Sequence, residues 1–284
     1  MIDQKIAIIG GTGKFGKHLA RNLEDNNQII ITGRNIERAK QEAEGESWTP
    51  MEQKNAVKDA DVVIVSVPIS VTVDVIHEIG PHVSDDALFC DVTSVKKKPV
   101  QAMKDYSNEV LGMHPMYAPS NSIEGQKIVL TPEKGKKWTE MEEFWIENGG
   151  DIHVTDPESH DKAMSIVQGL MHFSELVMAD VIRKSDLGGE ETDEYSTPIH
   201  QLLTDLTARM LNQQPGLYGS IQSENPENEK IRDNFIESAE DIKEIVGDEE
   251  EFAEKFEELG DEFDLEGAQE RTDKVIEFLS NEVR

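Results

Sequence analysis

The sequence contains few cysteines and few basic residues. Cys90 is the only cysteine among 284 residues, which excludes an intramolecular disulfide and a zinc site built from cysteines alone; we assign no metal site. Lysine and arginine together number 28 against 58 aspartates and glutamates, for a net charge of −30. Because phosphate groups bind to clustered cations, this balance argues against a nucleic-acid surface and against an anionic membrane partner.

Long apolar runs are also absent. No stretch approaches the roughly 20 apolar residues of a membrane-spanning helix, and none resembles a signal peptide. We therefore expect a soluble protein of the cytoplasm.

A charge this large is typical of disorder, of an acidic tail, or of a protein adapted to concentrated salt. Disorder fits poorly, because the acidic residues alternate with apolar ones at helical spacing and the hydrophobic content of 37% is sufficient for a core. At about 1 M salt the screening length falls to roughly 3 Å and self-repulsion fades. We therefore expect a haloarchaeal type of cytoplasm.

The first part of the chain has the pattern of a parallel sheet covered on both faces. Short apolar runs alternate with helical patterns, which predicts an α/β fold, a Rossmann-like doubly wound parallel sheet, over residues 1–155. The expected strands lie in the runs KIAII, QIIIT, DVVIVSVP, ALFCDVTS and EVLGMH. Two further runs, KIVLT and DIHVT, are expected to close the sheet near residue 155.

The rest of the chain has a different pattern. No further β-type run follows, and apolar residues recur every three or four positions, so residues 156–284 are predicted to form an all-helical domain. One long helix is expected over residues 157–185, a second over roughly 192–220, and three acidic helices after that. Apolar residues on more than one face of the long helices favour a homodimer of interwoven subunits.

A glycine cluster follows the first expected strand and opens a helix. Gly11, Gly13 and Gly16 form a G-x-G-x-x-G pattern, in which the first glycine allows a tight turn, the second lets the backbone approach a pyrophosphate, and the third lets helix and strand pack closely. This context favours dinucleotide binding over a simple glycine-rich turn. The residues assigned to the cofactor are Gly11, Thr12, Gly13, Phe15, Gly16, Arg34, Arg38, Ser66 and Pro68.

The second expected strand ends without the acidic residue that usually holds the ribose 2′-hydroxyl of NAD. Thr32 and Gly33 stand there, followed by Arg34 and, further on, Arg38. A missing carboxylate removes a clash with a 2′-phosphate, and a guanidinium is a bidentate partner for that group. We expect NADP; the alternative is that Arg34 stacks on the adenine and both NADP and NAD bind.

Three further motifs carry a more specific signal. They are DVTSVKKKPVQAM from Asp91, VLGMHPMYAPS from Val110 and HDKAMSIVQGLMHF from His160. Together they resemble the prephenate dehydrogenase family of tyrosine biosynthesis, over roughly residues 5–222. The resemblance implies that a nicotinamide cofactor takes hydride from C4 of prephenate, whose ring carboxylate leaves as CO2 to yield 4-hydroxyphenylpyruvate. Aromatisation drives this reaction, so the enzyme's main tasks are alignment and handling of the hydroxyl proton.

The resemblance assigns catalytic roles to two residues. His114 matches the family's catalytic histidine, and a neutral imidazole there would accept a hydrogen bond from the C4 hydroxyl. Outside such a motif, a histidine at a strand end is more often structural. Ser94 matches the serine of the family's TSVK segment and would orient His114 or the substrate; the alternative is an N-cap for the following helix.

The resemblance also implies a substrate pocket on the helical domain. His160, Gln168 and His172 are spaced by multiples of four, which places them on one face of a regular helix, and the resemblance assigns that face to the substrate. A satisfied core histidine is the alternative for each imidazole. Arg209 best matches the family's substrate-binding arginine, with an internal salt bridge as the alternative.

Local cations would have to attract an anionic cofactor and a dianionic substrate to so acidic a protein. Arg34, Arg38, Lys96 and Arg209 are the candidates. The chain also departs from the family where Phe-Gly commonly follows the HPM motif, because Tyr117 and Ala118 stand there. This departure leaves the substrate preference open.

Three other functions remain open. Arogenate dehydrogenase differs only by an amine on the side chain of the substrate. A deazaflavin-dependent NADP reductase shares a GGTG loop and an arginine after the second strand, but it leaves the HPM and HD motifs unexplained. A non-catalytic nucleotide-sensing protein is disfavoured because Ser94, His114 and Arg209 are present together.

Adaptation to salt predicts that the free energy of unfolding rises with KCl concentration. At low salt, the repulsion among the 58 acidic side chains is poorly screened. Urea unfolding followed by circular dichroism, from about 0.1 M to about 1 M KCl and above, measures this dependence. Full stability at the lowest salt concentration would contradict the expectation.

Overall fold

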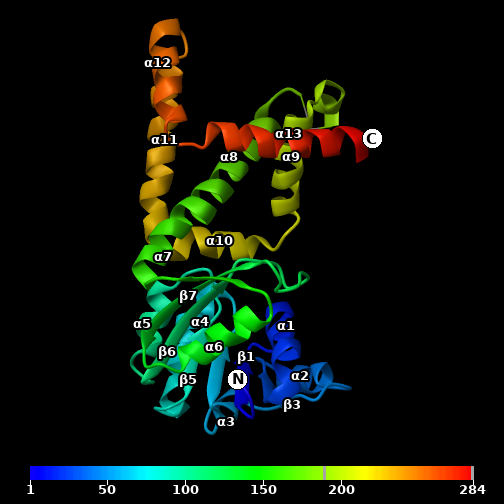
Figure 1. Ribbon diagram of the computed structural model, residues 1–284, viewed down its shortest axis with the longest axis vertical. Coiled ribbons are helices and arrows are strands. Elements are labelled where there is room, and N and C mark those ends of the chain that lie inside the picture. The colour runs from blue at the N-terminus through cyan, green and yellow to red at the C-terminus, as the bar shows by residue number, and fades with distance from the viewer. Residues whose placement is uncertain (188–189, 283–284) are drawn as a thin grey trace. The chain divides into compact units, whose positions relative to one another are not determined.

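The structure is a computed structural model that describes residues 1–187 and 190–282. The chain divides into two compact units, whose elements are labelled in Figure 1. The first unit comprises Met1–Ser165 together with Gly219–Pro226, and the second comprises Ile166–Tyr218 and the chain from Glu227 onward. The first unit therefore extends past residue 155 and takes in a short segment that returns from the helical part.

One eight-stranded sheet forms the centre of the first unit, in the order β3-β2-β1-β4-β5-β6-β7-β8. All seven predicted strands are present, and the Rossmann-like doubly wound sheet is confirmed. Every neighbouring pair is parallel except β6 and β7. The strands are β1 (Lys5–Ile9), β2 (Gln28–Thr32), β3 (Thr49–Pro50), β4 (Val62–Val65), β5 (Leu88–Asp91), β6 (Glu109–Pro115), β7 (Lys127–Lys134) and β8 (Asp151–Val154).

Two features of the sheet differ from the sequence-based expectation. β7 runs antiparallel to β6, because the connection over residues 116–126 contains no helix, and a parallel return requires a crossover of roughly a dozen residues or more. β3 is not marked by any apolar run, since it consists of Thr49 and Pro50 alone.

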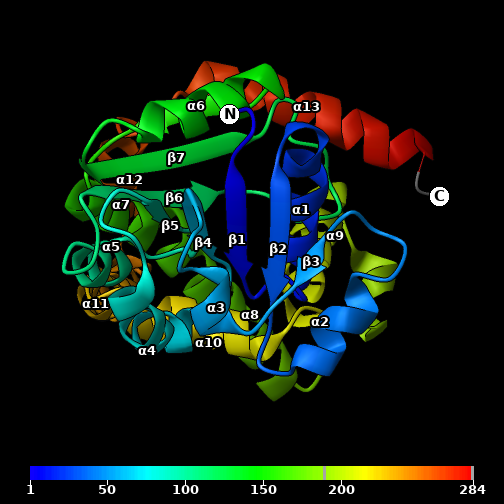
Figure 2. The same ribbon diagram turned by 90° about the horizontal axis from the view of Figure 1, so that it is seen from below.

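Helices cover both faces of the sheet and close two apolar cores (Figure 2). On β1, Ile6 and Ile8 enter one core while Ala7 and Ile9 enter the other, as the alternation of side chains along a strand requires. The first core receives side chains from α1 (Lys14–Leu23) and α6 (Trp138–Glu147). The second receives them from α3 (Gln53–Ala56), α4 (Ile69–Ile79) and α5 (Lys97–Met103), while α2 (Ile36–Glu42) follows β2.

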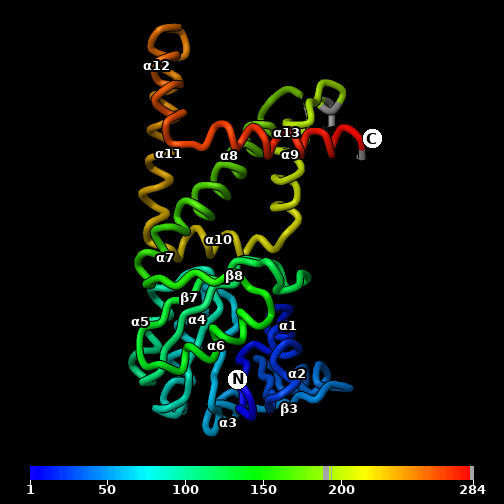
Figure 3. Tube along the Cα trace, viewed as in Figure 1, coloured from blue at the N-terminus to red at the C-terminus, as the bar shows by residue number. Residues whose placement is uncertain are grey.

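The chain after β8 is helical (Figure 3), and the three acidic helices at its end are confirmed. The expected long helix is interrupted by a π-helical turn, and the stretch expected as one helix over 192–220 contains two. Pro215 begins the second of these, because proline suits the first position of a helix and not its interior. The elements are α7 (Pro157–Met164), the π turn η3 (Ser165–Leu170), α8 (Met171–Lys184), η4 (Glu190–Tyr195), α9 (Pro198–Leu211), α10 (Pro215–Glu224), α11 (Glu227–Ile245), α12 (Glu249–Gly260) and α13 (Leu265–Glu282).

The helices of the second unit expose a large apolar surface. All but four of the exposed large apolar side chains of the described residues lie in this unit, Leu206, Phe256 and Phe263 among them. By length and composition alone, the stretch Pro157–Lys184 also passes for a membrane span, with a mean hydropathy of 1.2, but one such helix is weak evidence. Apolar surface of this extent is typical of a protein–protein interface.

Candidate active site

The glycine loop between β1 and α1 has the geometry of a dinucleotide site. A Cβ on Gly16 would lie 2.5 Å from the carbonyl oxygen of Gly10, so only glycine allows α1 to pack this closely. Gly13 precedes α1 without a side-chain cap, which leaves the first N–H groups of the helix directed at an incoming anion. Within this loop, Gly10 has a left-handed backbone conformation, with φ at +88°. The sequence pattern did not include Gly10, although it adjoins Gly11.

The residues predicted to hold the rest of the cofactor follow the carboxyl ends of β1, β2 and β4. Ser66 lies against the loop, because a Cβ on Gly10 would lie 2.2 Å from its carbonyl oxygen, and Pro68 begins α4. Arg34 and Arg38 are exposed, and Nη2 of Arg38 donates to the carbonyl oxygen of Thr12 at 3.4 Å. Both arginines thus follow the carboxyl end of β2, and Nε of Arg38 lies 3.8 Å from Oε1 of Glu42.

Phe15 forms an aromatic cluster with His18 and Tyr117, with ring centroids 5.5 to 5.8 Å apart. The Tyr117 hydroxyl lies 3.0 Å from Nε2 of His18, and burial raises the pKa of Tyr117. Tyr117 stands where the family commonly has phenylalanine, and its additional hydroxyl is thus hydrogen-bonded to a side chain of α1. His18 is a residue of this region that the motifs did not indicate.

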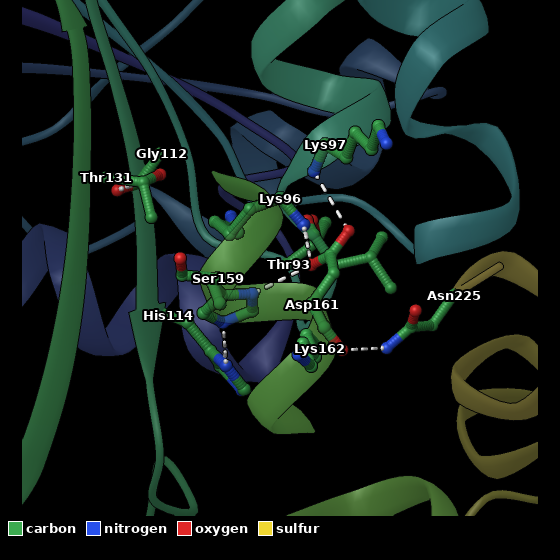
Figure 4. Close-up of polar contacts among 12 residues, drawn as sticks. Thr93, Lys96, Lys97, Gly112, His114, Thr131, Ser159, Asp161, Lys162 and Asn225 are labelled. Atoms are coloured by element: carbon green, nitrogen blue, oxygen red, sulfur yellow. Dashed lines mark hydrogen bonds and ion pairs between the residues drawn. The ribbon is translucent and has the colours of Figure 1, made fainter. Parts of the chain in front are cut away.

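His114 lies near the carboxyl end of β6 and is the first member of a hydrogen-bonded triad with His160 and Asp161. Its Nδ1 lies 2.9 Å from Nε2 of His160, and Nδ1 of His160 lies 2.8 Å from Oδ1 of Asp161. All three residues are buried, with at most 3% of their surface exposed. Figure 4 shows His114 and Asp161 in this arrangement, on neighbouring segments of the first unit.

The triad fixes which ring nitrogens carry protons. Because a carboxylate only accepts, Nδ1–H of His160 donates to Asp161, and Nε2 of His160 then accepts Nδ1–H of His114. The lone pair of His114 is therefore on Nε2. Burial lowers the pKa of His114 well below its ordinary value, and electrostatic interactions with His160 and Lys96 act in the same direction, so the ring is neutral at neutral pH.

The structure places His160 as its alternative interpretation has it, as a satisfied core histidine and not as a substrate contact. Both of its ring nitrogens are bound within the protein, and 1% of its surface is exposed. Burial lowers its pKa, while the hydrogen bond to Asp161 opposes this shift.

Lys96 is buried in the first unit, which overturns its expected role as a surface cation. Its Nζ donates to Oδ2 of Asp91 at 2.6 Å and to the carbonyl oxygen of Met113 at 2.8 Å, one residue before His114. A Cβ on Gly112 would lie 2.8 Å from Cδ of this lysine, so the lysine stem occupies the space beside that glycine. Burial lowers the pKa of the Lys96 ammonium, and Asp91 acts in the opposite direction.

The backbone of the same segment holds the third member of the triad. The amide nitrogens of Lys96 and Lys97 donate to the two carboxylate oxygens of Asp161, at 2.7 and 3.0 Å. The side chains of Lys97 and Lys98 pair with Glu158 and Glu224. Each of the three consecutive lysines 96–98 is therefore paired with an acidic side chain of the same chain.

Ser94 is half-buried in the loop between β5 and α5. Its hydroxyl makes no hydrogen bond within residues 1–187 or 190–282, and the residue before α5 is Lys96, which has no side-chain cap. The alternative interpretation of Ser94 as an N-cap is therefore wrong, and its role beside His114 remains a prediction.

The remaining predicted substrate residues belong to the second unit. Gln168 lies in the π turn, so the spacing of eight residues from His160 does not place both on one face of a regular α-helix. The His172 ring contacts Tyr218 with centroids 4.7 Å apart, and burial lowers its pKa. Arg209 is exposed on α9, and its role as a substrate ligand stays a prediction.

Comparisons with known proteins agree with these features. A family model described as "Prephenate dehydrogenase, nucleotide-binding domain" matches residues 19–154, and one described as "Prephenate dehydrogenase, dimerization domain" matches residues 156–259. The "Probable arogenate/prephenate dehydrogenase" of Methanocaldococcus jannaschii is 36% identical over 98% of this chain and 66% of its own length. The "T-protein" of Haemophilus influenzae is 30% identical over 79% of this chain and 57% of its own length.

Solved structures share the fold. Prephenate dehydrogenase from A. aeolicus, in complex with hydroxyphenyl propionate and NAD+, has a TM-score of 0.74 at 23% identity and covers 91% of this chain and 96% of its own. Synechocystis arogenate dehydrogenase has a TM-score of 0.72 at 16% identity, over 90% of this chain and 98% of its own. The chain spans 66% and 57% of the length of the two curated relatives named above.

The buried pair of Lys96 and Asp91 predicts a difference between single and double variants. Lys96→Met leaves the Asp91 carboxylate buried without its counter-charge, so we expect the free energy of unfolding to fall by about 3–5 kcal/mol. Asp91→Asn combined with Lys96→Met removes both charges and keeps an acceptor for Thr93, so most of the loss is recovered. Urea unfolding at one KCl concentration measures both. Equal stability of Lys96→Met and the unmodified protein would show that the pair is not buried.

Proposed function

Because the chain belongs to the prephenate dehydrogenase family, we propose that it catalyses the oxidative decarboxylation of prephenate to 4-hydroxyphenylpyruvate in tyrosine biosynthesis. The observation that carries this proposal is the triad of His114, His160 and Asp161. It leaves a buried, neutral imidazole with its lone pair on Nε2, at the sheet edge that also carries the glycine loop. A group of this kind accepts a proton from a substrate hydroxyl.

The glycine loop and the two arginines after β2 support NADP as the cofactor. When bound, the nicotinamide supplies the acceptor for the hydride that leaves C4 of the ring. The uncapped start of α1 would hold the pyrophosphate, and Arg34 and Arg38 would pair with the 2′-phosphate. No carboxylate stands at the end of β2 to repel that phosphate, and binding of NAD is the alternative.

The protein's own task is to move one proton. As C4 loses hydride, its O–H bond breaks, the oxygen becomes a carbonyl, and the proton passes to Nε2 of His114. The imidazolium so formed donates through Nδ1–H to His160, which is in turn held by the Asp161 carboxylate. The bond between the ring and its carboxylate then breaks, CO2 leaves, the bond electrons make the ring aromatic, and the resulting phenolate oxygen takes a proton back from His114, which becomes neutral again. The negative charge of Asp161 stabilises the protonated form at the moment that it arises.

We further propose that Arg209, His172 and Gln168 bind the substrate and that Ser94 assists His114. Prephenate carries two carboxylates, and an exposed guanidinium is a suitable partner for one of them. Arogenate is the second candidate substrate, because the relative from Methanocaldococcus jannaschii is named for both. The exposed apolar helices of the second unit support a homodimer, and the enzyme would act in the cytoplasm.

The proposal is tested by incubating the protein in molar KCl with prephenate or arogenate and with NADP or NAD. We expect reduced cofactor and 4-hydroxyphenylpyruvate, with NADP preferred. His114→Asn is expected to lower kcat by about two to four orders of magnitude, since it removes the proton acceptor. Binding of NADP, measured by calorimetry, should be unchanged. A variant that kept most of its turnover would contradict the role of His114, and a strong preference for NAD would contradict that of Arg34.

Arg209→Ala is expected to raise KM for prephenate by about 10- to 100-fold, because a charged hydrogen-bond partner of the substrate is lost. The affinity for NADP should change much less. Arg183→Ala is the matched control, since Arg183 is an exposed arginine of the same unit that pairs with Asp180. Equal effects of Arg209→Ala on the substrate and on the cofactor would remove the assignment.

A further inference from the structure

A short return segment, Gly219–Pro226, belongs to the first unit although the chain on both sides of it belongs to the second. It comprises the last half of α10 and the two residues before α11. Nothing in the proposed reaction or in the sequence motifs gives this segment a role. Its contacts with the first unit are nevertheless specific.

Three contacts attach the return segment to the rest of the first unit, and one of them reaches a member of the triad. Ile221 is 5% exposed and packs with Ile69 and Val95, the latter between Ser94 and Lys96. The carboxylate of Glu224 pairs with Lys98 at 2.8 Å. Nδ2 of Asn225 donates to the backbone carbonyl oxygen of Asp161 at 2.7 Å. Figure 4 shows Asn225 directed at the helical segment of Asp161 and Lys162.

The hydrogen bond of Asn225 holds the main chain of Asp161. Both residues are buried, at 3% and 2% exposure, so water does not replace a lost donor at this place. The carbonyl oxygen of Asp161, in α7, also accepts the backbone N–H of Ser165, the residue at which the π turn begins. The carboxylate is held at the same time by the amides of Lys96 and Lys97.

We propose that Asn225 is a positioning residue for the reaction. By holding the backbone of Asp161, it fixes the orientation of the His160 ring, and His160 in turn fixes the orientation of the His114 ring and of its lone pair on Nε2. This inference rests on the proposed function for its kinetic consequence, but not for its structural one. Without the bond from Asn225, the main chain at Asp161 is held by fewer partners. The two imidazoles then sample more orientations, and fewer encounters with substrate have the correct alignment.

The test is Asn225→Ala in the full-length protein, with two readouts. We expect kcat for the productive substrate to fall about tenfold, with KM and the affinity for NADP within about twofold of the unmodified protein. The imidazole 15N chemical shifts of His114 and His160, measured by NMR spectroscopy without substrate, report the tautomer of each ring. In the variant, we expect these shifts to change from those of a single tautomer to an average over two.

The control variant is Lys98→Ala, which removes the exposed ion pair to Glu224 on the same segment and leaves Asn225 in place. We expect neither kcat nor the tautomers to change, because an exposed ion pair contributes little. If Asn225→Ala does not fold, Asn225→Ser, whose side chain is too short for the same bond, is measured with the same expectation.

The outcomes separate the inference from the proposed function. Unchanged kcat together with unchanged tautomers in a folded Asn225→Ala would overturn the inference. Loss of the single tautomer in a protein that turns over neither prephenate nor arogenate would support the positioning by Asn225 and refute the proposed activity. A rise in KM with kcat unchanged would also overturn the inference, because it would place Asn225 at the substrate.

Discussion

The carboxylate of Asp161 is the group on which the geometry of the site depends. It accepts the amide N–H groups of Lys96 and Lys97 and the ring N–H of His160, so segments far apart in the sequence meet at two oxygen atoms. A buried carboxylate is stable only when its acceptor positions are filled. The loop after β5, the start of α5 and helix α7 are therefore fixed together, and the proton arrangement of His114 follows from them.

The burial of Lys96 changes the electrostatic description of this acidic protein. Its ammonium is neutralised inside by Asp91, and the next two lysines pair with glutamates. Arg34 and Arg38 remain exposed beside the glycine loop, although Nε of Arg38 lies 3.8 Å from Oε1 of Glu42. In a chain with a net charge of −30, dissolved salt would serve ligand approach as well as folding, since it screens the surrounding carboxylates.

Much of the fold could be predicted, because buried parallel strands leave continuous apolar runs and the glycine loop has a fixed spacing. The direction of β7, the two-residue β3 and the π turn leave no comparable pattern. In the site, His114 could be identified from its motif. The pairing of His114 with His160, and of Asp161 with Asn225, joins residues 46 and 64 positions apart, which only the folded chain brings together. The one local signal that was available is Asp91 five residues before Lys96, in a chain with few cations.

Gly112 on β6 is the feature with the widest consequence for related sequences. Its backbone is an ordinary strand, but a Cβ there would lie 2.3 Å from Oγ1 of Thr131 and 2.8 Å from Cδ of Lys96. The glycine is required by three side chains packed against it, because Cγ2 of Val100 would also lie 2.7 Å from that Cβ, and not by its own torsion angles. Evolution therefore constrains these positions as a group: a lineage that replaced the lysine alone by a short residue would still meet the threonine and the valine, so the glycine could be replaced only after those neighbours had changed as well.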